Sequence, residues 1–533
     1  MIPPAPPAVS AQAPRGLKQT FVGSPTNVCL GLCLILIALP AWSGQPSGVT
    51  VTYGLEEIRD KSLRAVSLDS LATEGLTGLS TIDPAFDVAR GEDKRIELRY
   101  GGRVLASYAA PRADDALGWG MVLERAARQA AHKSQAVAHA DNDQVTQAIF
   151  DSMLTKLDVF SHYAGPAEAH ERYASRSGFG GIGVRFDPTG DGIALTEVMP
   201  DSPALHAKLK VGDVITAIDG EPLGDLDQNA ISQKLRGPIA SPVKLTLQRP
   251  DQPATMVTLH RSLIVPPTVA SRIEGGVGLV TVSGFNDKTG ANVAEAVSKA
   301  KASPGFKGIV LDLRGNPGGL LDQGIAVADI FIAQGRILAT RGRHPDALQT
   351  YDAKGGDVGE SVPLVVLVDG RTASAAEIAA AALQDSGRAV LVGTNSFGKG
   401  TVQTVLPLPN QGELTLTWSR FYVPSGYALH GLGVLPAICT AGGSPAGDKL
   451  LADGRAASPA FFAAWRSVPP EDMAKRYKLR GHCQSEDHSH NELDLAIARH
   501  LLADPALYAK AVLVAAPVST ASAQHGLPSL NRN

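Results

Sequence analysis

Residues 363–384 read PLVVLVDGRTASAAEIAAAALQ, and this stretch decides the fold class. Its first part, Pro363–Val368, is a short run of Val and Leu of the kind that forms a buried strand. A turn containing Asp369 and Gly370 follows, and an alanine-rich helix is then expected over Ser374–Gln384. A strand that leads directly into a helix is the unit of an α/β layered core.

The same alternation continues from Val269 to Ile438, and we assign residues 266–440 to this core. Further strands are expected at Val277–Val282, Gly308–Leu313 and Ala389–Val392, and a further helix at Asp322–Ile332.

The rest of the chain divides into segments of different character. Residues 50–174 have mainly helical patterns with one hairpin around Gly101-Gly102, and residues 175–265 form a β-rich module of domain size. Residues 441–533 are expected to be a partly disordered C-terminal extension. The predicted architecture is therefore an α/β multidomain protein with a mainly helical N-terminal domain.

Bulk composition supports several folded domains. A chain of 533 residues is too long for one hydrophobic core. Hydrophobic residues make up 44% and charged residues 19%, which is typical of a globular protein and not of a disordered one. The formal net charge of -3 provides no basic footprint, so we expect no nucleic-acid partner.

The first 43 residues have the pattern of an export signal. Arg15 and Lys18 precede an apolar run over Val28–Ala41, and small residues follow at the spacing of a cleavage site. Because this run is short for a membrane span and has Pro40 at its end, we expect a cleaved signal peptide. The protein is then periplasmic or secreted, and an uncleaved membrane anchor is the alternative.

Cysteine positions bear on the same question. Cys29 and Cys33 lie inside the leader, so the mature chain keeps Cys439 and Cys483. In an exported protein such a pair forms either one disulfide or two buried thiols, and the sequence leaves both open.

Ser374 and Lys399 have the properties of a nucleophile and its base. Ser374 lies where the predicted strand passes into a helix, and free amides there favour negative charge. Lys399 lies between two glycines, and burial would lower its pKa from about 10.4 so that the neutral amine can take the serine proton. A helix cap for Ser374 and a loop charge for Lys399 are the structural alternatives. Together they predict a serine hydrolase with a lysine base.

Two further groups are expected to assist. Gln403 lies four residues after Lys399 along an extended run, and even spacing on a strand places side chains on one face, so its amide would orient the lysine amine. Gly318 and Gly319 form a turn that presents N–H groups, which with the amide of Ala375 would make an oxyanion hole.

Three segments resemble the carboxyl-terminal processing peptidases, also called tail-specific proteases: Asn316-Pro-Gly-Gly319, Thr372-Ala-Ser-Ala-Ala-Glu-Ile378 and Phe397-Gly-Lys-Gly-Thr-Val-Gln403. The resemblance covers residues 157–438. It implies a crotonase-like α/β core and no cofactor. It also implies site roles: nucleophile Ser374, general base Lys399, orienting residue Gln403, and oxyanion donors Gly318 and Ala375.

Two positions depart from this family. Ala376 replaces a serine that commonly follows the nucleophile, which removes a rival hydroxyl. Residues 435–438 read Leu-Pro-Ala-Ile, where the family usually has an aspartate after the proline.

The β-rich module resembles a PDZ domain. Residues 178–184 read Gly-Phe-Gly-Gly-Ile-Gly-Val, like the loop whose amides bind a terminal carboxylate, and the next strand offers an edge for β-augmentation. The expected peptide-binding residues are Gly181, Ile182, Gly183 and Val184. Lys208 and Val211 replace the usual glycine and proline of a later turn, and a purely structural module is the alternative.

The predicted function is that of an exported serine endopeptidase that cleaves proteins near free C-termini. A catalytically silent PDZ scaffold and a hydrolase without tail selection are the alternatives, and a recruiting adaptor and the oligomeric state are left open. No metal site is expected, because a group of His, Cys and acidic residues lacks ligand spacing and fits a solvated polar loop: His482, Cys483, Glu486, Asp487, His488, His490.

Overall fold

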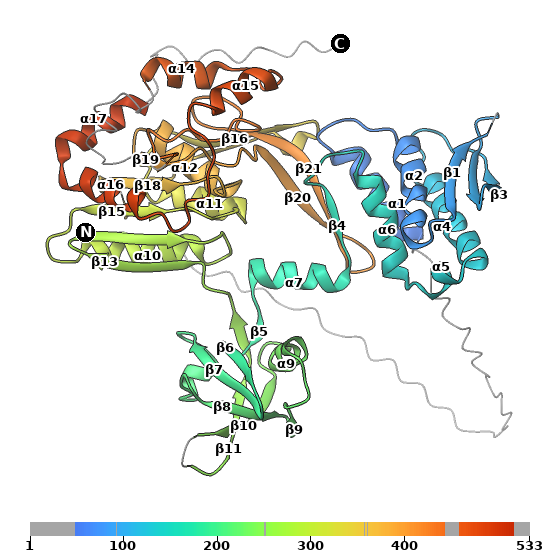
Figure 1. Cartoon of the computed structure of the whole chain (residues 1–533), viewed down its shortest axis with the longest axis horizontal. Helices are drawn as coiled ribbons and strands as arrows, with labels where there is room; N and C mark the ends of the chain where they lie inside the picture. Colours follow the sequence, from blue (N-terminus) through green and yellow to red (C-terminus); the bar gives the residue numbers. More distant parts are fainter. Residues whose placement is uncertain are drawn as a thin grey trace, which may run out of the picture. The chain divides into compact units, whose positions relative to one another are not determined.

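The computed structural model describes residues 48–442 and 458–515, except positions 92, 250, 251, 356, 357 and 360 (Figure 1). The predicted signal peptide and the end of the C-terminal extension lie outside these residues. Among the helices that are described, none combines the length and the apolar character needed to cross a bilayer.

The central sheet carries the predicted strand–helix alternation. Its strand order is β13-β14-β15-β18-β19-β22, with β13 antiparallel to β14 and every later pair parallel. All residues of β15, β18 and β19 are buried, as is usual for parallel strands covered on both faces. The strands span Val269–Glu274, Val277–Val282, Gly308–Asp312, Leu364–Val368, Val390–Gly393 and Ile438–Cys439.

Helices connect and cover these strands. Helix α10 packs on β14, α11 lies between α10 and α12, and α16 crosses β15, β18 and β19 (Figure 1). Every residue of α12 is buried, which explains why its sequence is mostly alanine, since small side chains permit close packing on all sides. These helices span Thr289–Lys301 (α10), Leu321–Asp329 (α11), Ala375–Asp385 (α12) and Glu492–Ala503 (α16).

The chain also forms a second, antiparallel sheet. Its strand order is β17-β16-β21-β20, and β4 pairs with β21. Helix α12 contacts β16 of this sheet. A single 3-10 turn, Pro345–Ala347, lies between β16 and β17. The strands span Gln349–Asp352 (β17), Arg336–Gly342 (β16), Glu413–Tyr422 (β21), Thr401–Pro407 (β20) and His162–Ala164 (β4).

The described residues of 48–154 contain six helices and a three-stranded sheet. The predicted hairpin is present as β2 (Ile96–Tyr100) and β3 (Arg103–Tyr108), and β1 (Phe86–Arg90) adds a strand that the sequence reading missed. The helices span Gly48–Lys61 (α1), Leu68–Thr77 (α2), Leu79–Ile82 (α3), Ala116–Lys133 (α4), Gln135–His139 (α5) and Asn142–Leu154 (α6).

The hydrophobic core of this N-terminal segment includes residues from another part of the chain. The cluster of buried side chains that contains Trp119 and Phe150 also includes four leucines of the β20–β21 hairpin: Leu406, Leu408, Leu414 and Leu416. The hairpin that follows Lys399 is therefore fixed by packing against the helical segment.

The β-rich module has a separate core. Its sheet runs β11-β10-β8-β7-β6, with β9 on β8, while β5 pairs with β12. Helix α7 (Pro166–Ser177) precedes it, and β6 (Val184–Thr189) is an edge strand. The other elements span Phe179–Gly181 (β5), Gly192–Val198 (β7), Pro203–His206 (α8), Val214–Ile218 (β8), Glu221–Pro222 (β9), Gln228–Leu235 (α9), Pro242–Gln248 (β10), Thr255–His260 (β11) and Ser262–Ile264 (β12).

The described part of the C-terminal extension is folded. Helices α14 (Pro459–Ser467), α16 and α17 (Pro505–Ala515) contribute buried residues to the same cluster as the central sheet, and α15 (Met473–Arg480) packs the partly buried Leu479 against it. The predicted mobile tail after these helices lies outside the described residues.

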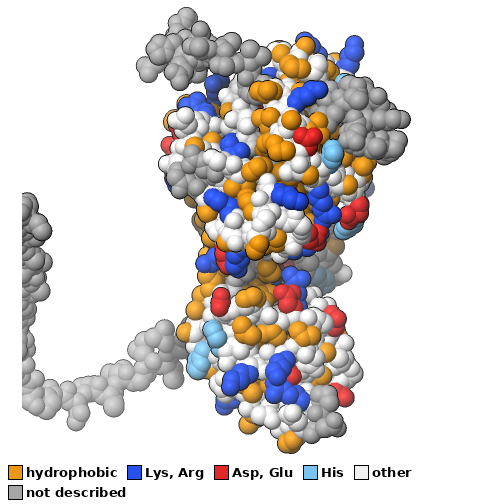
Figure 2. All heavy atoms as spheres, turned by 90° about the vertical axis from the view of Figure 1, so that its left-hand side faces the viewer, with side chains coloured by type: hydrophobic (Ala, Val, Ile, Leu, Met, Phe, Trp, Pro, Cys, Tyr) orange, Lys and Arg blue, Asp and Glu red, His pale blue; other side chains and the backbone are white. Residues whose placement is uncertain are grey.

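Charged side chains of both signs are interspersed on the face seen in Figure 2, with apolar side chains between them. The described side chains visible on that face form no continuous basic area of the kind that binds nucleic acid.

Candidate active site

The three family-like segments meet because their strands are neighbours. Strands β15, β18 and β19 are adjacent and parallel, so the loops that follow them emerge at the same edge of the sheet. These loops cover 313–320, 369–374 and 394–400 and carry Gly318, Ser374 and Lys399. Backbone hydrogen bonds join them directly, from Ala373 N to Asn316 O at 2.9 Å and from Phe397 N to Thr372 O at 3.0 Å.

Ser374 holds a strained backbone conformation at the start of α12. Its φ of 56° and ψ of −119° lie in a region that L-residues other than glycine rarely adopt. Such a conformation costs roughly 1–3 kcal/mol and persists only where neighbouring structure holds it, which is a feature of functional sites. The turn before it is held by buried Asp369, whose Oδ1 accepts the amides of Gly315, Arg371 and Thr372.

Glu377 ties the serine and lysine loops together. This fully buried carboxylate accepts the backbone amides of Ser374 and Lys399 through Oε2, each at 2.9 Å. Its Oε1 accepts the Gly398 amide at 2.7 Å and the Ser396 hydroxyl at 2.5 Å. Burial raises the pKa of the Glu377 carboxyl, and the four donated hydrogen bonds oppose that effect.

The Lys399 amine lies in an apolar setting. Its Nζ is 4.9 Å from the centre of the Phe160 ring, and among the described residues it has no hydrogen-bonded or ion-paired partner. Burial lowers the pKa of Lys399, while the carboxylates of Glu377 and Asp158 partly oppose this shift. The arrangement favours a neutral amine, which is the form that can accept a proton.

The even spacing of residues on a strand, from which Gln403 was predicted to lie beside Lys399, does not apply here. Strand β20 begins at Thr401, so Lys399 precedes the strand, and the ladder is bulged between Val402 and Gln403. Strand parity therefore cannot relate the two side chains. The Gln403 amide instead donates to the hydroxyls of Thr401 at 3.0 Å and Thr417 at 3.1 Å.

Gly318 lies against the serine. A Cβ at this position would come within 2.8 Å of Ser374 Cβ and 2.9 Å of Ala373 O, and the φ of +102° is one that glycine tolerates. Its amide, however, donates to Asn316 Oδ1 at 2.8 Å. Ala375 opens α12, where first-turn amides have no partner within the helix.

Sequence reasoning missed the role of Glu377, although a signal was present. Ser374 and Glu377 stand at the Ser-x-x-Glu spacing of a helix capping box, which predicts a glutamate that turns back to the amide of residue 374. Its second set of donors, on the lysine loop, comes from tertiary structure and leaves no local pattern.

The predicted peptide-binding residues of the β-rich module line a small hollow of about 90 Å³ between β6 and α9. Gly181, Ile182, Gly183 and Val184 all contribute to its wall. A Cβ on Gly183 would lie 2.3 Å from the Ser202 Cβ, so the loop requires glycine there. The unpaired edge of β6 borders the same hollow.

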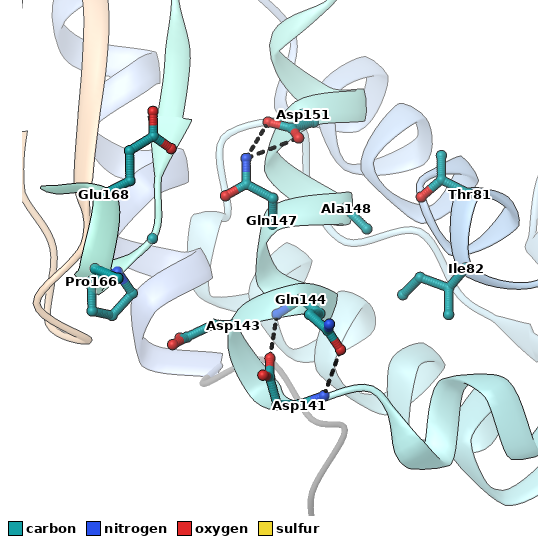
Figure 3. A pocket seen from close by; sticks show the side chains of 12 residues that line it. Thr81, Ile82, Asp141, Asp143, Gln144, Gln147, Ala148, Asp151, Pro166 and Glu168 are labelled. Atoms are coloured by element: carbon teal, nitrogen blue, oxygen red, sulfur yellow. Dashed lines mark hydrogen bonds between the residues drawn. The ribbon is translucent and has the colours of Figure 1, made fainter. Parts of the chain in front are cut away.

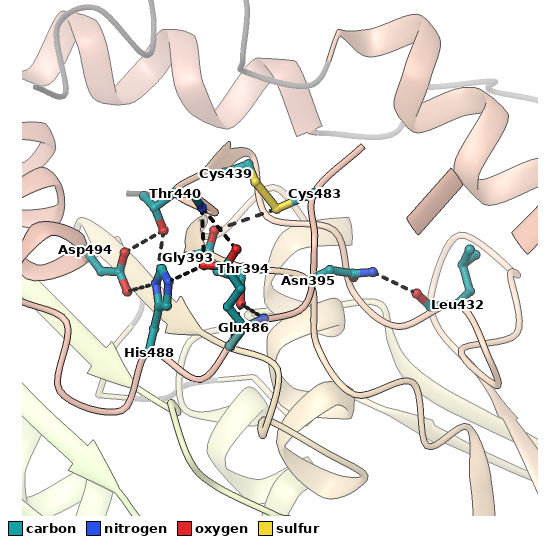
Figure 4. The surroundings of a disulfide bond; sticks show 11 residues. Gly393, Thr394, Asn395, Leu432, Cys439, Thr440, Cys483, Glu486, His488 and Asp494 are labelled. Atoms are coloured by element: carbon teal, nitrogen blue, oxygen red, sulfur yellow. Dashed lines mark hydrogen bonds and ion pairs between the residues drawn. A yellow bond between two sulfur atoms is a disulfide. The ribbon is translucent and has the colours of Figure 1, made fainter. Parts of the chain in front are cut away.

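The C-terminal segment is bound to the loops that carry the candidate residues. The expectation of a solvated polar loop holds for the exposed His482, Asp487 and His490 and is wrong for the buried Cys483 and His488. His488 is 6% exposed, and it contacts Asp494 and Glu486 at 3.1 Å each (Figure 4). Its amide donates to Asp369, and a disulfide joins Cys439 to Cys483. Within the described ranges no group of three or more potential ligands is arranged to hold a metal ion.

Arg314 joins the loop that carries Gly318 to the same segment. It forms a bidentate ion pair with Asp312 and also reaches Asp494 at 3.3 Å. These contacts of Asp312 and Arg314 hold the loop in shape.

A separate hollow of about 530 Å³ lies between α6 and the start of α7 (Figure 3). None of the predicted site residues lines it. Two of its acidic side chains serve local structure, since Asp141 caps α6 and Asp151 accepts the Gln147 amide.

Comparisons with known proteins agree with the arrangement of these segments. A model of peptidase family S41 matches residues 276–440, and a PDZ domain model matches residues 195–249. A carboxy-terminal-processing protease from Bartonella bacilliformis is 38% identical over 312 residues, which are 57% of this chain and 72% of the relative. A probable CtpA-like serine protease from Staphylococcus aureus is 33% identical over 302 residues, covering 56% of this chain and 60% of the relative.

Solved structures give a similar list. The photosystem II D1 C-terminal processing protease is 29% identical and aligns with a TM-score of 0.34 over 55% of this chain and 81% of its own. The PDZ domain of a carboxy-terminal protease from Vibrio cholerae, solved with a peptide, is 28% identical and covers 16% of this chain and 96% of its own, with a TM-score of 0.15.

Proposed function

This chain belongs to the carboxy-terminal-processing proteases of peptidase family S41, which are serine peptidases, and from this we propose a specific Ser–Lys mechanism. Ser374 Oγ attacks the scissile carbonyl carbon while Lys399 Nζ accepts the hydroxyl proton. The lysine then gives that proton to the leaving amine, and water hydrolyses the acyl-enzyme ester. No cofactor takes part in these steps.

One observation carries this proposal, namely the setting of the Lys399 amine. A lysine at the surface keeps its proton at neutral pH and cannot act as a base. Lys399 packs on Phe160 and has a lowered pKa, caused first by burial. The buried carboxylate of Glu377 holds the backbone of this lysine and of Ser374 to a common oxygen. Gln403, fixed by two threonine hydroxyls, is proposed to orient the amine during turnover.

The oxyanion is proposed to bind the amides of Ala375 and Gly318. The Ala375 amide is a helix N-terminal donor, to which the helix dipole adds. The Gly318 amide first has to leave Asn316 Oδ1, a bond that the oxyanion would replace.

Substrate choice is proposed to come from the PDZ domain. The amides around Gly181, Ile182 and Gly183 would bind a free carboxylate, and the edge of β6 from Val184 onward would pair with the last residues of the substrate. Proteins with free C-termini are the proposed substrate class.

Export to the periplasm or the exterior is part of the proposal. Its support is the leader pattern together with the Cys439–Cys483 disulfide, since such bonds persist in oxidising compartments.

A catalytically silent PDZ scaffold is the second candidate. The observation that favours it is the engaged Gly318 amide, because an oxyanion hole with one donor occupied is not ready for chemistry.

Degradation of an unstructured protein by the purified chain separates the two candidates. The native protein should cleave it, and Ser374→Ala and Lys399→Ala should abolish cleavage without loss of the folded state, whereas Ser386→Ala at the other end of α12 should not. Equal activity in all variants would reject the dyad. Substrates with an amidated C-terminus should be cut more slowly if the PDZ domain selects tails.

A further inference from the structure

A cavity of about 450 Å³ lies beside Lys399, and the proposed bond-breaking steps do not use it. Phe160, whose ring lies beside the Lys399 amine, forms part of its wall. So do Thr401 and Thr417, the two residues whose hydroxyls accept from Gln403. The cavity therefore shares the Phe160 ring with the surroundings of the proposed general base, although Lys399 itself is not part of its lining.

The walls are firmly connected to the core. Leu63, which follows α1, donates its amide to Thr417 O at 2.9 Å, and the Ser161 hydroxyl accepts the Thr417 amide at 3.1 Å. The cavity is thus bounded by the N-terminal segment on one side and by β21 on the other, with direct hydrogen bonds between them.

Basic groups dominate the lining. Arg64, Lys156 and Arg420 face a single acid, Asp158. Lys156 is paired with Glu74 at 2.8 Å. Both Asp158 oxygens are already in use, because they accept from the amides of residues 160 and 161 and from the hydroxyls of residues 161 and 417. The guanidinium groups of Arg64 and Arg420 therefore have no free acidic side chain to pair with in the lining.

Neither guanidinium has a partner within the part of the chain that the structure describes. Arg420 Nε is buried and makes no hydrogen bond, and no acid lies in ion-pair contact with Arg420 or with the exposed Arg64. A buried charged donor without a partner costs free energy, so such a group usually marks a place where a ligand or ion completes the site.

His430 also lines the cavity, and the charged groups around it are mainly positive. Burial lowers the pKa of His430, and the guanidinium groups of Arg420, Arg476 and Arg64 lower it further, against the one opposing carboxylate of Asp158. These effects favour the neutral imidazole, and its Nδ1 is buried without a hydrogen-bond partner.

We propose that this cavity binds a carboxylate of the polypeptide held for cleavage, with Arg64 and Arg420 as its ligands. The inference rests on the proposed endopeptidase function and adds a second acid-recognition site to the PDZ groove. An arginine pairs well with a carboxylate, whereas an uncharged side chain leaves the guanidinium unmatched, so the cavity confers preference for acidic substrates. The carboxylate comes from an Asp or Glu side chain or from the chain terminus.

Three versions of one quenched fluorescent peptide distinguish these sources. The first has an amidated end and one Glu near the cleaved bond, the second replaces that Glu by Gln, and the third is the Gln peptide with a free carboxyl end. KM and kcat are measured for each with the native full chain and with Arg64→Gln and Arg420→Gln. Arg103→Gln, an exposed arginine of β3 outside the lining, is the matched control.

Loss of one charged hydrogen-bonding partner should raise KM for the acidic peptide about tenfold and leave the Gln peptide unchanged. A response of the free-carboxyl peptide alone assigns the pocket to the terminus. If each peptide has the same KM in both variants as in the native chain, the pocket is overturned while the endopeptidase function stands.

If the native chain cleaves none of the peptides, the proposed function fails. The proposed pocket is then tested by measuring peptide binding instead of cleavage. Measured by fluorescence anisotropy, Ser374→Ala should still bind the acidic peptide more tightly than the neutral one. Adding Arg64→Gln should remove this difference in affinity. Because Arg64 is exposed, its substitution leaves folding intact even if Arg420→Gln destabilises the chain.

Discussion

The Oε2 atom of Glu377 accepts the Lys399 backbone amide at 2.9 Å, and the same atom accepts the Ser374 amide at the same distance. A single buried oxygen thus sets the separation of two loops that leave different strands. Side chains on rigidly held backbones react faster than mobile ones, because their relative position is fixed before the substrate arrives.

Glu377→Gln should therefore lower kcat. Glutamine offers one acceptor oxygen in place of two, and its amide nitrogen would face donors that it cannot satisfy. We expect kcat to fall on the order of 100-fold with a smaller change in KM, measured on an uncharged peptide.

Asp385→Asn is the matched control for this change. Asp385 is also buried and lies at the opposite end of α12, where it accepts hydrogen bonds from Arg466 and Ser425. Both variants should lose stability, since each disrupts a buried charge network, but the Asp385 variant should retain kcat. Equal kcat losses in the two variants would mean that Glu377 acts only through stability.

Gly318→Ala should inactivate the enzyme by displacing the serine. The new methyl group would lie 2.8 Å from Ser374 Cβ. Gly387→Ala is its control, because Gly387 also has a positive φ but a Cβ there would meet nothing within 4 Å. Thermal denaturation should show strain in both variants, and only the Gly318 variant should lose cleavage. Full activity of Gly318→Ala would contradict the close approach of the two loops.

Activity should rise with pH through the lowered pKa of Lys399, because only the neutral amine accepts the serine proton. Asp158 raises that pKa, so Asp158→Asn should move the rising limb of kcat/KM to lower pH. Asp143→Asn, on an exposed turn of α6, should leave the limb in place. A limb that moves to higher pH in Asp158→Asn would contradict the assignment of Lys399 as base.

Reduction of the Cys439–Cys483 disulfide should weaken the site from a distance. The segment that it anchors supplies Arg480, which donates to Ser396 O at 3.0 Å, and Glu486, whose carbonyl accepts the Gly370 amide at 2.7 Å. Loss of the crosslink should cost roughly 2–4 kcal/mol of stability. Cys483→Ser should lower the melting temperature and the cleavage rate.

A reductant provides the control for that prediction. It should affect the native chain in the same way and leave Cys483→Ser unchanged. If the reductant leaves the melting temperature of the native chain unchanged, the disulfide does not stabilise the fold.

The candidate catalytic segments could be predicted from the sequence because each combines a strand end with an unusual local pattern. The strands before Gly318 and Ser374 were predicted close to their observed bounds, and adjacent parallel strands bring their following loops together. The β-rich module was readable for the same reason, since its short strands and glycine turns are local features.

Tertiary contacts explain what the sequence did not reveal. Gln403 was related to Lys399 by strand parity, but the strand starts only at Thr401 and its pairing with β21 shifts register between Val402 and Gln403, and neither feature has a local signature. His488 was expected in solvent, yet it is buried against Asp494 by a helix that packs on the central sheet. The helical N-terminal segment shares its core with Leu414 of a distant hairpin, which composition cannot reveal.

Labelling with a fluorophosphonate, followed by peptide mass spectrometry, tests the central claim most directly, because the reagent reacts with an activated serine whatever the substrate. The account predicts one adduct, on Ser374, whose rate of formation rises with pH in the native chain and is lost in Lys399→Ala while the folded state persists. An adduct on another residue, or labelling of Ser374 at an unchanged rate in Lys399→Ala, would contradict the Ser374–Lys399 dyad.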